Sequence, residues 1–202
     1  MKSSFRKDLE KEKRLSQLLD SYYTKHLKQY TFNRVLDKKE QLAGVDIMFR
    51  HKKRGRSYPI DEKAQLDYVN ERLSTFAFEL YYEKNSELKP GWFFDAEKKT
   101  EFYALVTSIF SDNPGQYTSC DITFVNRKKL ITALEKKLVS AEKLKKLILP
   151  NLGFHGKMHL EALDPKFEGY VYFSSKNKKE KPVNLVLYLD FLHQIEVAKR
   201  LI

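Results

Sequence analysis

The sequence predicts an α/β fold in which a leading helix is followed by a β-sheet and then by further helices. Three observations predict it: a helical stripe of apolar residues comes first, short strand-like segments follow, and another helical stripe begins near residue 126. Hydrophobic residues make up 42% of the 202 positions and aromatic residues 13%, which suffices for a sizeable core. We expect one domain overall.

The first helix is predicted over residues 8–30. One buried stripe follows the spacing i, i+3, i+4, i+7, i+11 and consists of Leu15, Leu18, Leu19, Tyr22 and His26. The opposite face is charged. A first strand is predicted directly afterwards, over residues 30–36.

The segment that starts at Gly44 predicts a β-hairpin with strands over residues 44–49 and 57–65 and a basic loop between them. Side chains alternate between the two faces of a strand. Asp61 and Lys63 therefore share one face of the second strand.

The same hairpin places Asp46 beside Asp61, whereas Glu62 points to the opposite face. Two carboxylates are typical ligands of Mg²⁺, which usually completes its coordination with water and substrate phosphate. Lys63 could then position or deprotonate a water molecule, or stabilise the charge that develops on a phosphate. The alternative is an ordinary salt bridge at the end of a strand.

This pattern resembles the PD-(D/E)xK nuclease superfamily, which has the restriction-endonuclease-like fold. Its motif is an Asp, a gap of one hairpin, then Asp or Glu, any residue, and Lys; here these are Asp46 and Asp61-Glu62-Lys63, with Val45 at the proline position. The resemblance implies a restriction-endonuclease-like core over residues 1–150, with a leading helix, a central mixed β-sheet and flanking helices. Residues 151–202 would form a C-terminal β-rich extension packed on this core.

The resemblance also implies roles for the individual residues. Asp46 and Asp61 would be metal ligands, with the main-chain carbonyl of Glu62 as a third ligand. Lys63 would be the catalytic lysine, and Gln65 would occupy a polar position that some members use beside the metal.

In this superfamily the leading helix often adds an acid to the metal site. Glu12 is our candidate, with Glu10 and Asp20 as alternatives, and a solvated helix face is the other explanation for each of them. The function implied is Mg²⁺-dependent hydrolysis of phosphodiester bonds, in which Mn²⁺ can substitute. We expect DNA ahead of RNA as substrate.

The charge balance agrees with a nucleic-acid partner. Lys and Arg number 38 against 27 Asp and Glu, which gives a net charge of +11. The hairpin loop concentrates this charge and is predicted to contact backbone phosphates through Arg50, Lys52, Lys53, Arg54 and Arg56. The alternatives are a solvated hairpin tip or, in a eukaryotic source, a basic targeting signal.

Two other functions remain open from the residues alone. One is a non-catalytic nucleic-acid-binding protein on the same fold. The other is a basic interaction protein whose positive surface meets an acidic partner, and in which the charged trio is a salt bridge. Binding of Mg²⁺ or Mn²⁺ distinguishes a nuclease site from that salt bridge.

Later segments are assigned from the same periodicities. We predict a strand at 75–82 as the third strand of the hairpin sheet, a buried strand or helix at 101–110, and a strand at 121–125. Asn126 is a predicted N-cap, followed by a helix that a restart at Ser140 extends to residue 148.

The stripe of this helix is Leu130, Ile131, Leu134, Leu138 and Ala141. Two strands at 169–174 and 183–189 and a closing helix at 191–202 complete the chain.

Cysteine content and hydropathy suggest the cellular setting. Cys120 is the single cysteine, so an intramolecular disulfide is excluded and a reducing, cytoplasmic location is expected. No membrane span and no signal peptide are predicted. The oligomeric state stays open, with a homodimer as one option because a cut through both strands needs a dimer or two binding events.

Overall fold

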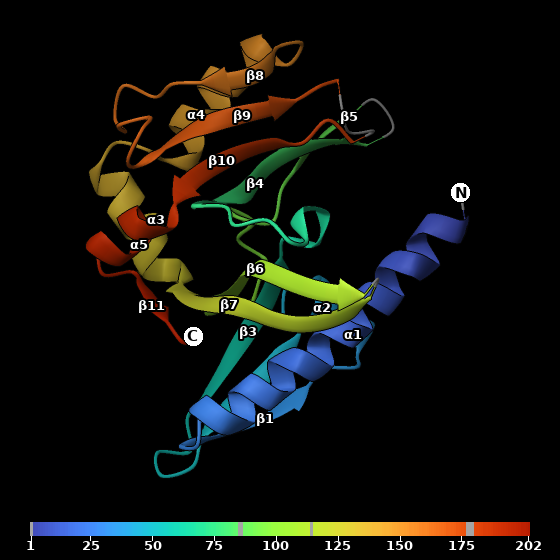
Figure 1. The fold of residues 1–202 in the computed structure, drawn as a ribbon. Helices are drawn as coiled ribbons and strands as arrows, with labels where there is room; N and C mark the ends of the chain where they lie inside the picture. Colours follow the sequence, from blue (N-terminus) through green and yellow to red (C-terminus); the bar gives the residue numbers. More distant parts are fainter. Residues whose placement is uncertain (1, 85–86, 114, 177–179) are drawn as a thin grey trace. The chain divides into compact units, whose positions relative to one another are not determined.

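The computed structural model describes residues 2–84, 87–113, 115–176 and 180–202, with the main chain alone for residues 2–9 and 84. These residues form two β-sheets and five α-helices, so the fold is mixed α/β, as predicted (Figure 1).

The chain divides into two compact units. The first comprises Met1–Leu73, Thr100–Phe124 and Lys199–Ile202, and the second comprises Ser74–Lys99 and Val125–Ala198. The predicted division at residue 150 therefore falls inside the second unit.

The first unit contains a six-stranded sheet with the order β1-β2-β3-β6-β7-β11. Its strands are β1 (Tyr30–Arg34), β2 (Ile47–His51), β3 (Ser57–Ala64), β6 (Phe102–Asn113), β7 (Gln116–Asn126) and β11 (Ala198–Arg200). The pairs β1–β2 and β2–β3 are antiparallel, whereas β3 and β6 are parallel, so the sheet is mixed. The short helix α2 (Lys38–Leu42) and the 3₁₀ turn η1 (Leu66–Tyr68) connect these strands.

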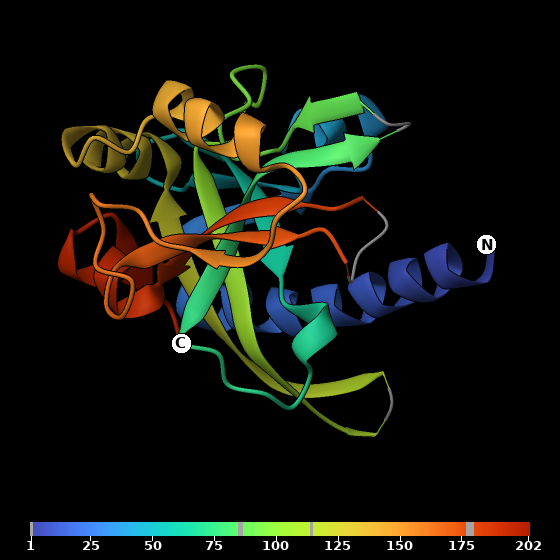
Figure 2. The same cartoon turned by 90° about the horizontal axis from the view of Figure 1, so that it is seen from above.

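Helix α1 (Lys2–His26) packs on one face of this sheet and ends four residues before the predicted end (Figure 2). The residues that it buries in the core are Leu15, Leu19 and Tyr23, at a spacing of i, i+4, i+8. They join a cluster that includes Ile47 from β2. The predicted stripe was wrong at its end, because His26 is exposed, and it included the half-buried Tyr22 where the structure buries Tyr23.

The strand beside β3 differs from the one predicted. Strand β4 (Thr75–Lys84) lies in the second sheet, and β6 takes the position that residues 75–82 were expected to fill. A parallel neighbour requires a crossover connection. Residues 66–101 supply it, and this connection contains β4 itself.

The second unit contains a five-stranded sheet with the order β5-β4-β10-β9-β8, in which the pairs are antiparallel. Besides β4, its strands are β5 (Glu87–Pro90), β8 (His155–Met158), β9 (Gly169–Ser174) and β10 (Val183–Tyr188). The strands predicted at 169–174 and 183–189 are confirmed. The C-terminal strands share their sheet with β4, so the expected β-rich extension contains an earlier part of the chain as well.

Helices α3 (Arg127–Lys136) and α4 (Ala141–Ile148) follow β7 along the chain, and η2 (Leu149–Asn151) comes between α4 and β8. The predicted caps are confirmed, because the side chain of Asn126 accepts from the N–H of Lys129 and that of Ser140 from Lys143. The predicted stripe was wrong at Leu138, which is exposed because α3 has already ended, and at Ala141, which is exposed at the start of α4.

The predicted closing helix at 191–202 is shorter than expected. Helix α5 (Leu189–Gln194) ends before Glu196, whose φ of 56° is incompatible with a continuing right-handed helix. The chain then extends as β11, and Leu201 and Ile202 exchange main-chain hydrogen bonds with Ile122 of β7.

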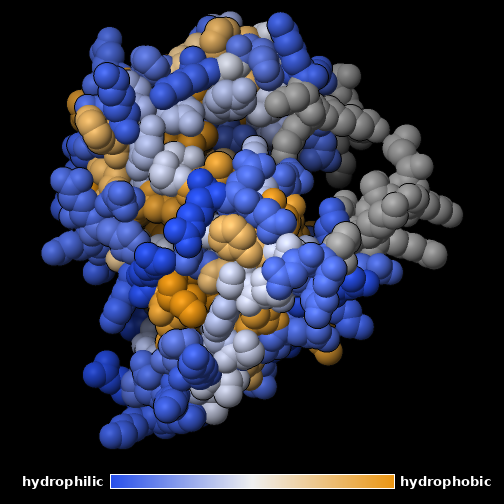
Figure 3. All heavy atoms as spheres, in the orientation of Figure 1, coloured by the Kyte–Doolittle hydropathy of each residue, from blue (hydrophilic) through white to orange (hydrophobic). Residues whose placement is uncertain are grey.

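Hydrophilic residues predominate on the face drawn in Figure 3, and hydrophobic residues appear there in small separate groups. This agrees with a sequence in which 32% of the residues are charged. Within the described ranges, no helix combines the length and the apolar character needed to cross a membrane.

Candidate metal and catalytic site

The pairing of β2 with β3 positions Asp46. Ile47 lies opposite Ile60 in the antiparallel ladder, and the N–H of Asp46 donates to the carbonyl oxygen of Ile60 at 2.9 Å. Asp46 Oδ2 accepts from the N–H of Glu62 at 2.8 Å. The hairpin therefore brings Asp46 beside the Asp61–Lys63 segment, as the sequence predicts.

Asp61 and Lys63 lie on one face of β3 and form an ion pair. The side chain of Asp61 is almost completely buried, with the residue only 2% exposed, and its Oδ1 lies 2.5 Å from Lys63 Nζ. A buried carboxylate is costly unless a cation or hydrogen-bond donors compensate its charge. Lys63 supplies that compensation within the sheet.

Asp46 has a strongly perturbed ionisation equilibrium. Burial, the nearby charge of Asp61 and a side-chain hydrogen bond with Asp61 raise the pKa of Asp46 to about 7, against the opposing effects of Lys63 and of the Glu62 N–H. The nearby charge of Asp61 thus disfavours the ionised form of Asp46 near neutral pH. A bound cation would offset this repulsion.

This perturbation predicts a stability change for Asp46→Asn. The folded-state pKa of Asp46 lies above its ordinary value of 3.8, so the folded state binds the extra proton and wild-type stability falls as pH rises from about 4 to about 7. The amide does not titrate. We expect the unfolding free energy of the variant, relative to that of wild type, to increase by about 1–3 kcal/mol from pH 4 to pH 8. Urea denaturation in EDTA measures this change. A difference that is the same at both pH values would contradict the assignment.

The main chain of β3 adds a third oxygen. Pro59 O and Gln65 N bond to the β6 side of the strand, whereas Ile60 O and Glu62 N bond to Asp46 on the β2 side. The N–H and C=O of one strand residue point the same way, so the Glu62 carbonyl also points to the β2 side. Its expected role as a ligand is therefore compatible with the strand geometry.

This set of donors fits Mg²⁺ in chemistry. Two carboxylates and a carbonyl are hard oxygen ligands, and Mg²⁺ commonly takes one or two carboxylates and completes its octahedron with water and phosphate. Among the described residues, no group of three or more His, Cys, Asp or Glu side chains could hold a metal ion. Asp46 and Asp61 provide two such side chains, so a metal ion held by them would also need the Glu62 carbonyl and water as ligands.

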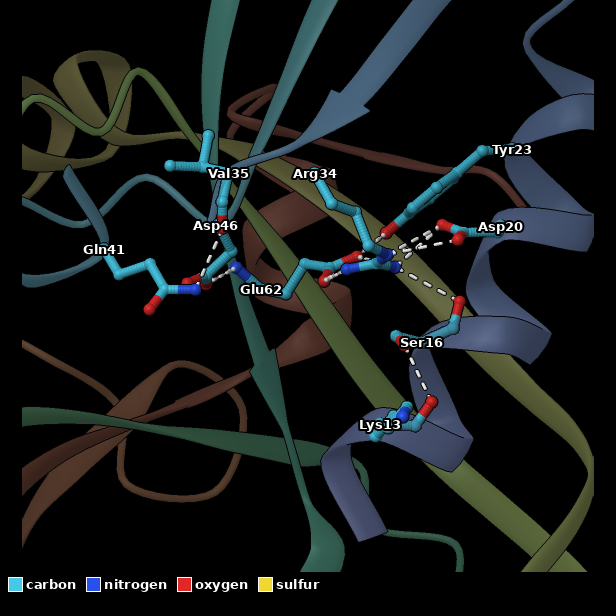
Figure 4. Close-up of polar contacts among 9 residues, drawn as sticks. All are labelled: Lys13, Ser16, Asp20, Tyr23, Arg34, Val35, Gln41, Asp46 and Glu62. Carbon is cyan, nitrogen blue, oxygen red and sulfur yellow. Dashed lines mark hydrogen bonds and ion pairs between the residues drawn. The ribbon is translucent and has the colours of Figure 1, made fainter. Parts of the chain in front are cut away.

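The side chain of Glu62 does not reach the same site, because it points to the opposite face of β3 (Figure 4). There it accepts from Tyr23 Oη at 2.8 Å and from Arg34 Nη1 at 2.7 Å. Arg34 in turn donates from Nε to both Asp20 carboxylate oxygens, at 3.0 and 3.1 Å, and from Nη2 to the carbonyl of Ser16 at 3.2 Å. We call Tyr23, Arg34 and Asp20 the Glu62 clamp.

The leading helix adds an acid to this clamp and not to the carboxylate pair. Asp20, one of the predicted alternatives, is held by Arg34 on the Glu62 side of the sheet. Glu12, the preferred candidate, is an exposed residue of α1. The structure thus offers no contact of Glu12 with Asp46 or Asp61 among the described residues.

The two glutamines near the site have structural contacts. Gln65 directly follows β3, and its N–H donates to the carbonyl of Val106 in β6 at 3.0 Å. Gln41 donates from Nε2 to the carbonyl of Val35 at 2.9 Å, and the N–H of Val35 donates to the carbonyl of Asp46 (Figure 4). Gln41 therefore supports the main chain that carries Asp46.

The basic loop is exposed at the far end of the hairpin. Its turn is closed by His51 Nδ1, which accepts from the N–H groups of Lys53 and Arg54. At about 3.3 Å per strand residue the tip lies about 15–25 Å from Asp46 and Asp61. Arg50, predicted on the loop, is an exposed residue of β2. Lys52 is exposed on the loop and donates from Nζ to the carbonyl of Lys28 at 2.6 Å, and the exposed Arg56 forms an ion pair with Glu101 at 2.6 Å.

Sequence reasoning missed the Glu62 clamp. The buried stripe included Tyr22 where the structure buries Tyr23, and Arg34 was assigned only to a strand. A spacing of i, i+4, i+8 from Leu15 identifies Tyr23, and a buried tyrosine hydroxyl requires a polar partner. No pattern in the sequence pairs Arg34 with Glu62, because they meet only when β1 lies beside β2.

Comparisons with protein-family models, with curated proteins and with solved structures give no match for this chain.

Proposed function

We propose that this protein is a metal-dependent nuclease that hydrolyses phosphodiester bonds, with DNA as the expected substrate ahead of RNA. The observation that carries the proposal is the convergence of Asp46, Asp61 and Lys63 at the open end of the β2–β3 hairpin. Paired carboxylates next to a lysine provide both a cation site and a group that acts on water or phosphate.

The first unit supports a restriction-endonuclease-like core through the order of its elements. A leading helix packs on a mixed sheet, an antiparallel hairpin carries the charged trio, and a parallel strand lies against the second strand of that hairpin. The leading helix and the mixed sheet agree with what the motif resemblance implies, whereas the parallel strand β6 was not predicted and helices α3 and α4, expected to flank the core, belong to the second unit.

The proposed mechanism assigns metal binding to the carboxylates and activation of water to the lysine. Asp46, Asp61 and the Glu62 carbonyl would hold Mg²⁺, which when bound lowers the pKa of water and polarises the phosphate. Lys63, released from its ion pair when a cation compensates Asp61, would orient or deprotonate the attacking water. Its ammonium would also stabilise charge on the phosphate in the transition state.

Two measurements test the proposal together. Calorimetric titration with Mn²⁺ measures whether the site binds a divalent cation, and incubation with plasmid DNA, single-stranded DNA and RNA in Mg²⁺ or Mn²⁺ measures cleavage. We expect binding of Mn²⁺ and metal-dependent cleavage of at least one substrate. Absence of Mn²⁺ binding would overturn the proposal.

A specific observation favours one alternative. The direct ion pair of Lys63 with Asp61 compensates the buried charge without a metal ion. If the trio is only a salt bridge, the protein binds nucleic acid or an acidic partner through its basic surface. Calorimetric titration with Mn²⁺ then gives no heat of binding.

The basic loop predicts how the substrate is held. The tip lies about 15–25 Å from the carboxylates, and nucleic acid advances about 3.4 Å per nucleotide, so its phosphate contacts fall about 4–7 nucleotides from the cut. We expect Lys52→Ala/Lys53→Ala/Arg54→Ala to raise KM without changing kcat. Its slope of log affinity against log salt should be shallower by up to about 3.

A matched triple variant provides the control. Lys143, Lys145 and Lys146 are exposed on α4 in the second unit, and their replacement by alanine removes the same charge. Duplexes that extend less than about 4 nucleotides beyond the cut should bind wild type and the loop variant alike. Equal losses in the two triple variants would show that only net charge matters.

A further inference from the structure

Glu62 connects two layers of the first unit through a single residue. Its side chain is held on the α1 face by Tyr23 and Arg34, and its main-chain N–H holds Asp46 at the start of β2. Only 12% of the Glu62 side chain is exposed, and Tyr23 is completely buried. The hydrogen bond between Tyr23 and Glu62 is therefore inaccessible to substrate, whereas Arg34 and Asp20 are partly exposed.

The bonds on both sides of Glu62 limit how its peptide unit can turn. A strand residue rotates about the strand axis as one piece, so a side chain held on one face sets the direction of its N–H and C=O. Arg34 contacts both carboxylate oxygens of Glu62, at 2.7 Å and 3.4 Å, which removes rotation of the carboxylate as well. The direction of the N–H determines where Asp46 Oδ2 lies.

We propose that Tyr23 and Arg34 are positioning residues of the metal site, which act through Glu62 to orient Asp46 and the Glu62 carbonyl toward the cation. The inference rests on the proposed nuclease function. Neither residue touches Asp46, Asp61 or Lys63 in the described hydrogen bonds. Hydrogen-bond partners that orient metal ligands typically contribute about 10- to 100-fold to metal affinity, because they restrict the motion of the ligands.

Tyr23→Phe is the most selective test. It removes the hydroxyl that bonds to Glu62 and leaves the ring in its edge contacts with Phe32 and Phe49, at 5.7 and 5.1 Å between centroids. We expect the Kd for Mn²⁺, measured by calorimetry without nucleic acid, to rise about tenfold. Glu62→Leu removes the acceptor of the bonds from Tyr23 and Arg34 and should raise the Kd by at least as much.

Three controls separate positioning from general destabilisation. Glu62→Gln keeps a side-chain oxygen that accepts from Tyr23 and Arg34, so it should bind Mn²⁺ within about threefold of wild type. Tyr22→Phe alters the neighbouring, half-buried tyrosine and should leave the Kd unchanged. Ile122→Val removes a methyl group from the core cluster and should lower the melting temperature without affecting the Kd.

The outcomes distinguish the two proposals. If wild type binds Mn²⁺ and both Tyr23→Phe and Glu62→Leu bind it equally tightly, the positioning role is overturned and the nuclease proposal stands. A Kd that changes in Ile122→Val as much as in Tyr23→Phe also overturns the positioning role. Failure of wild type to bind Mn²⁺ overturns both proposals.

Discussion

Replacing Lys63 with alanine is expected to abolish metal-dependent cleavage while the protein still folds and binds Mn²⁺. Lys63 is the cation nearest to the buried Asp61, and no other charged partner of Asp61 appears among the described ion pairs. A group that moves a proton or stabilises charge in the transition state typically contributes 100-fold or more to kcat, so we expect cleavage to fall by at least about 100-fold. Single-turnover cleavage at saturating enzyme measures this loss directly.

The matched control for Lys63 is Lys137→Ala. Lys137 also forms an ion pair, 2.7 Å from Glu168, but it lies in the second unit. Its loss should leave the rate of cleavage within about twofold of wild type, because an ion pair that takes no part in the proposed chemistry affects at most stability. Retained cleavage by the Lys63→Ala variant would exclude Lys63 from the chemistry.

Arg34→Met is expected to destabilise the protein by about 2–4 kcal/mol. Arg34 bridges Asp20 and Glu62, and burial alone would lower its pKa, but hydrogen bonds to these two carboxylates raise it. Removal of the guanidinium leaves Glu62 facing Tyr23 without a cation. Urea denaturation at pH 7 measures the difference in unfolding free energy.

Two variants bracket this prediction. Arg200→Met breaks the exposed pair of Arg200 with Asp121, so we expect a loss below about 1 kcal/mol. The double variant Arg34→Met/Glu62→Leu removes both charges and should recover part of the stability, because apolar replacement of a buried pair is often neutral. An Arg34→Met loss no larger than that of Arg200→Met would show that the clamp contributes little to stability.

The motif hairpin could be predicted because its information is local. Alternation along a strand decides which side chains share a face, and a short basic loop between two strands decides that Asp46 meets Asp61. Both facts need only neighbouring residues, and the pairing of Ile47 with Ile60 confirms them. The helix caps at Asn126 and Ser140 were predictable for the same reason, since a cap and its helix are a few residues apart.

Errors arose where the fold depends on distant partners. Strand β4 has the composition of a good strand, but composition does not state which sheet a strand joins. Its ladder with β10 brings together residues about a hundred positions apart. Likewise, residues 198–202 follow β7 because Ile122 offers main-chain hydrogen bonds there, and no local pattern predicts that.

The sequence by itself determined the strand–loop–strand segment, the shared face of Asp61 and Lys63, and the basic character of the hairpin tip, because each depends on residues within one hairpin. Only the tertiary structure decided that β6 lies beside β3 and that Arg34 and Tyr23 hold Glu62. Those contacts join α1, β1 and β3, and burial of apolar side chains from all three brings their few polar groups together.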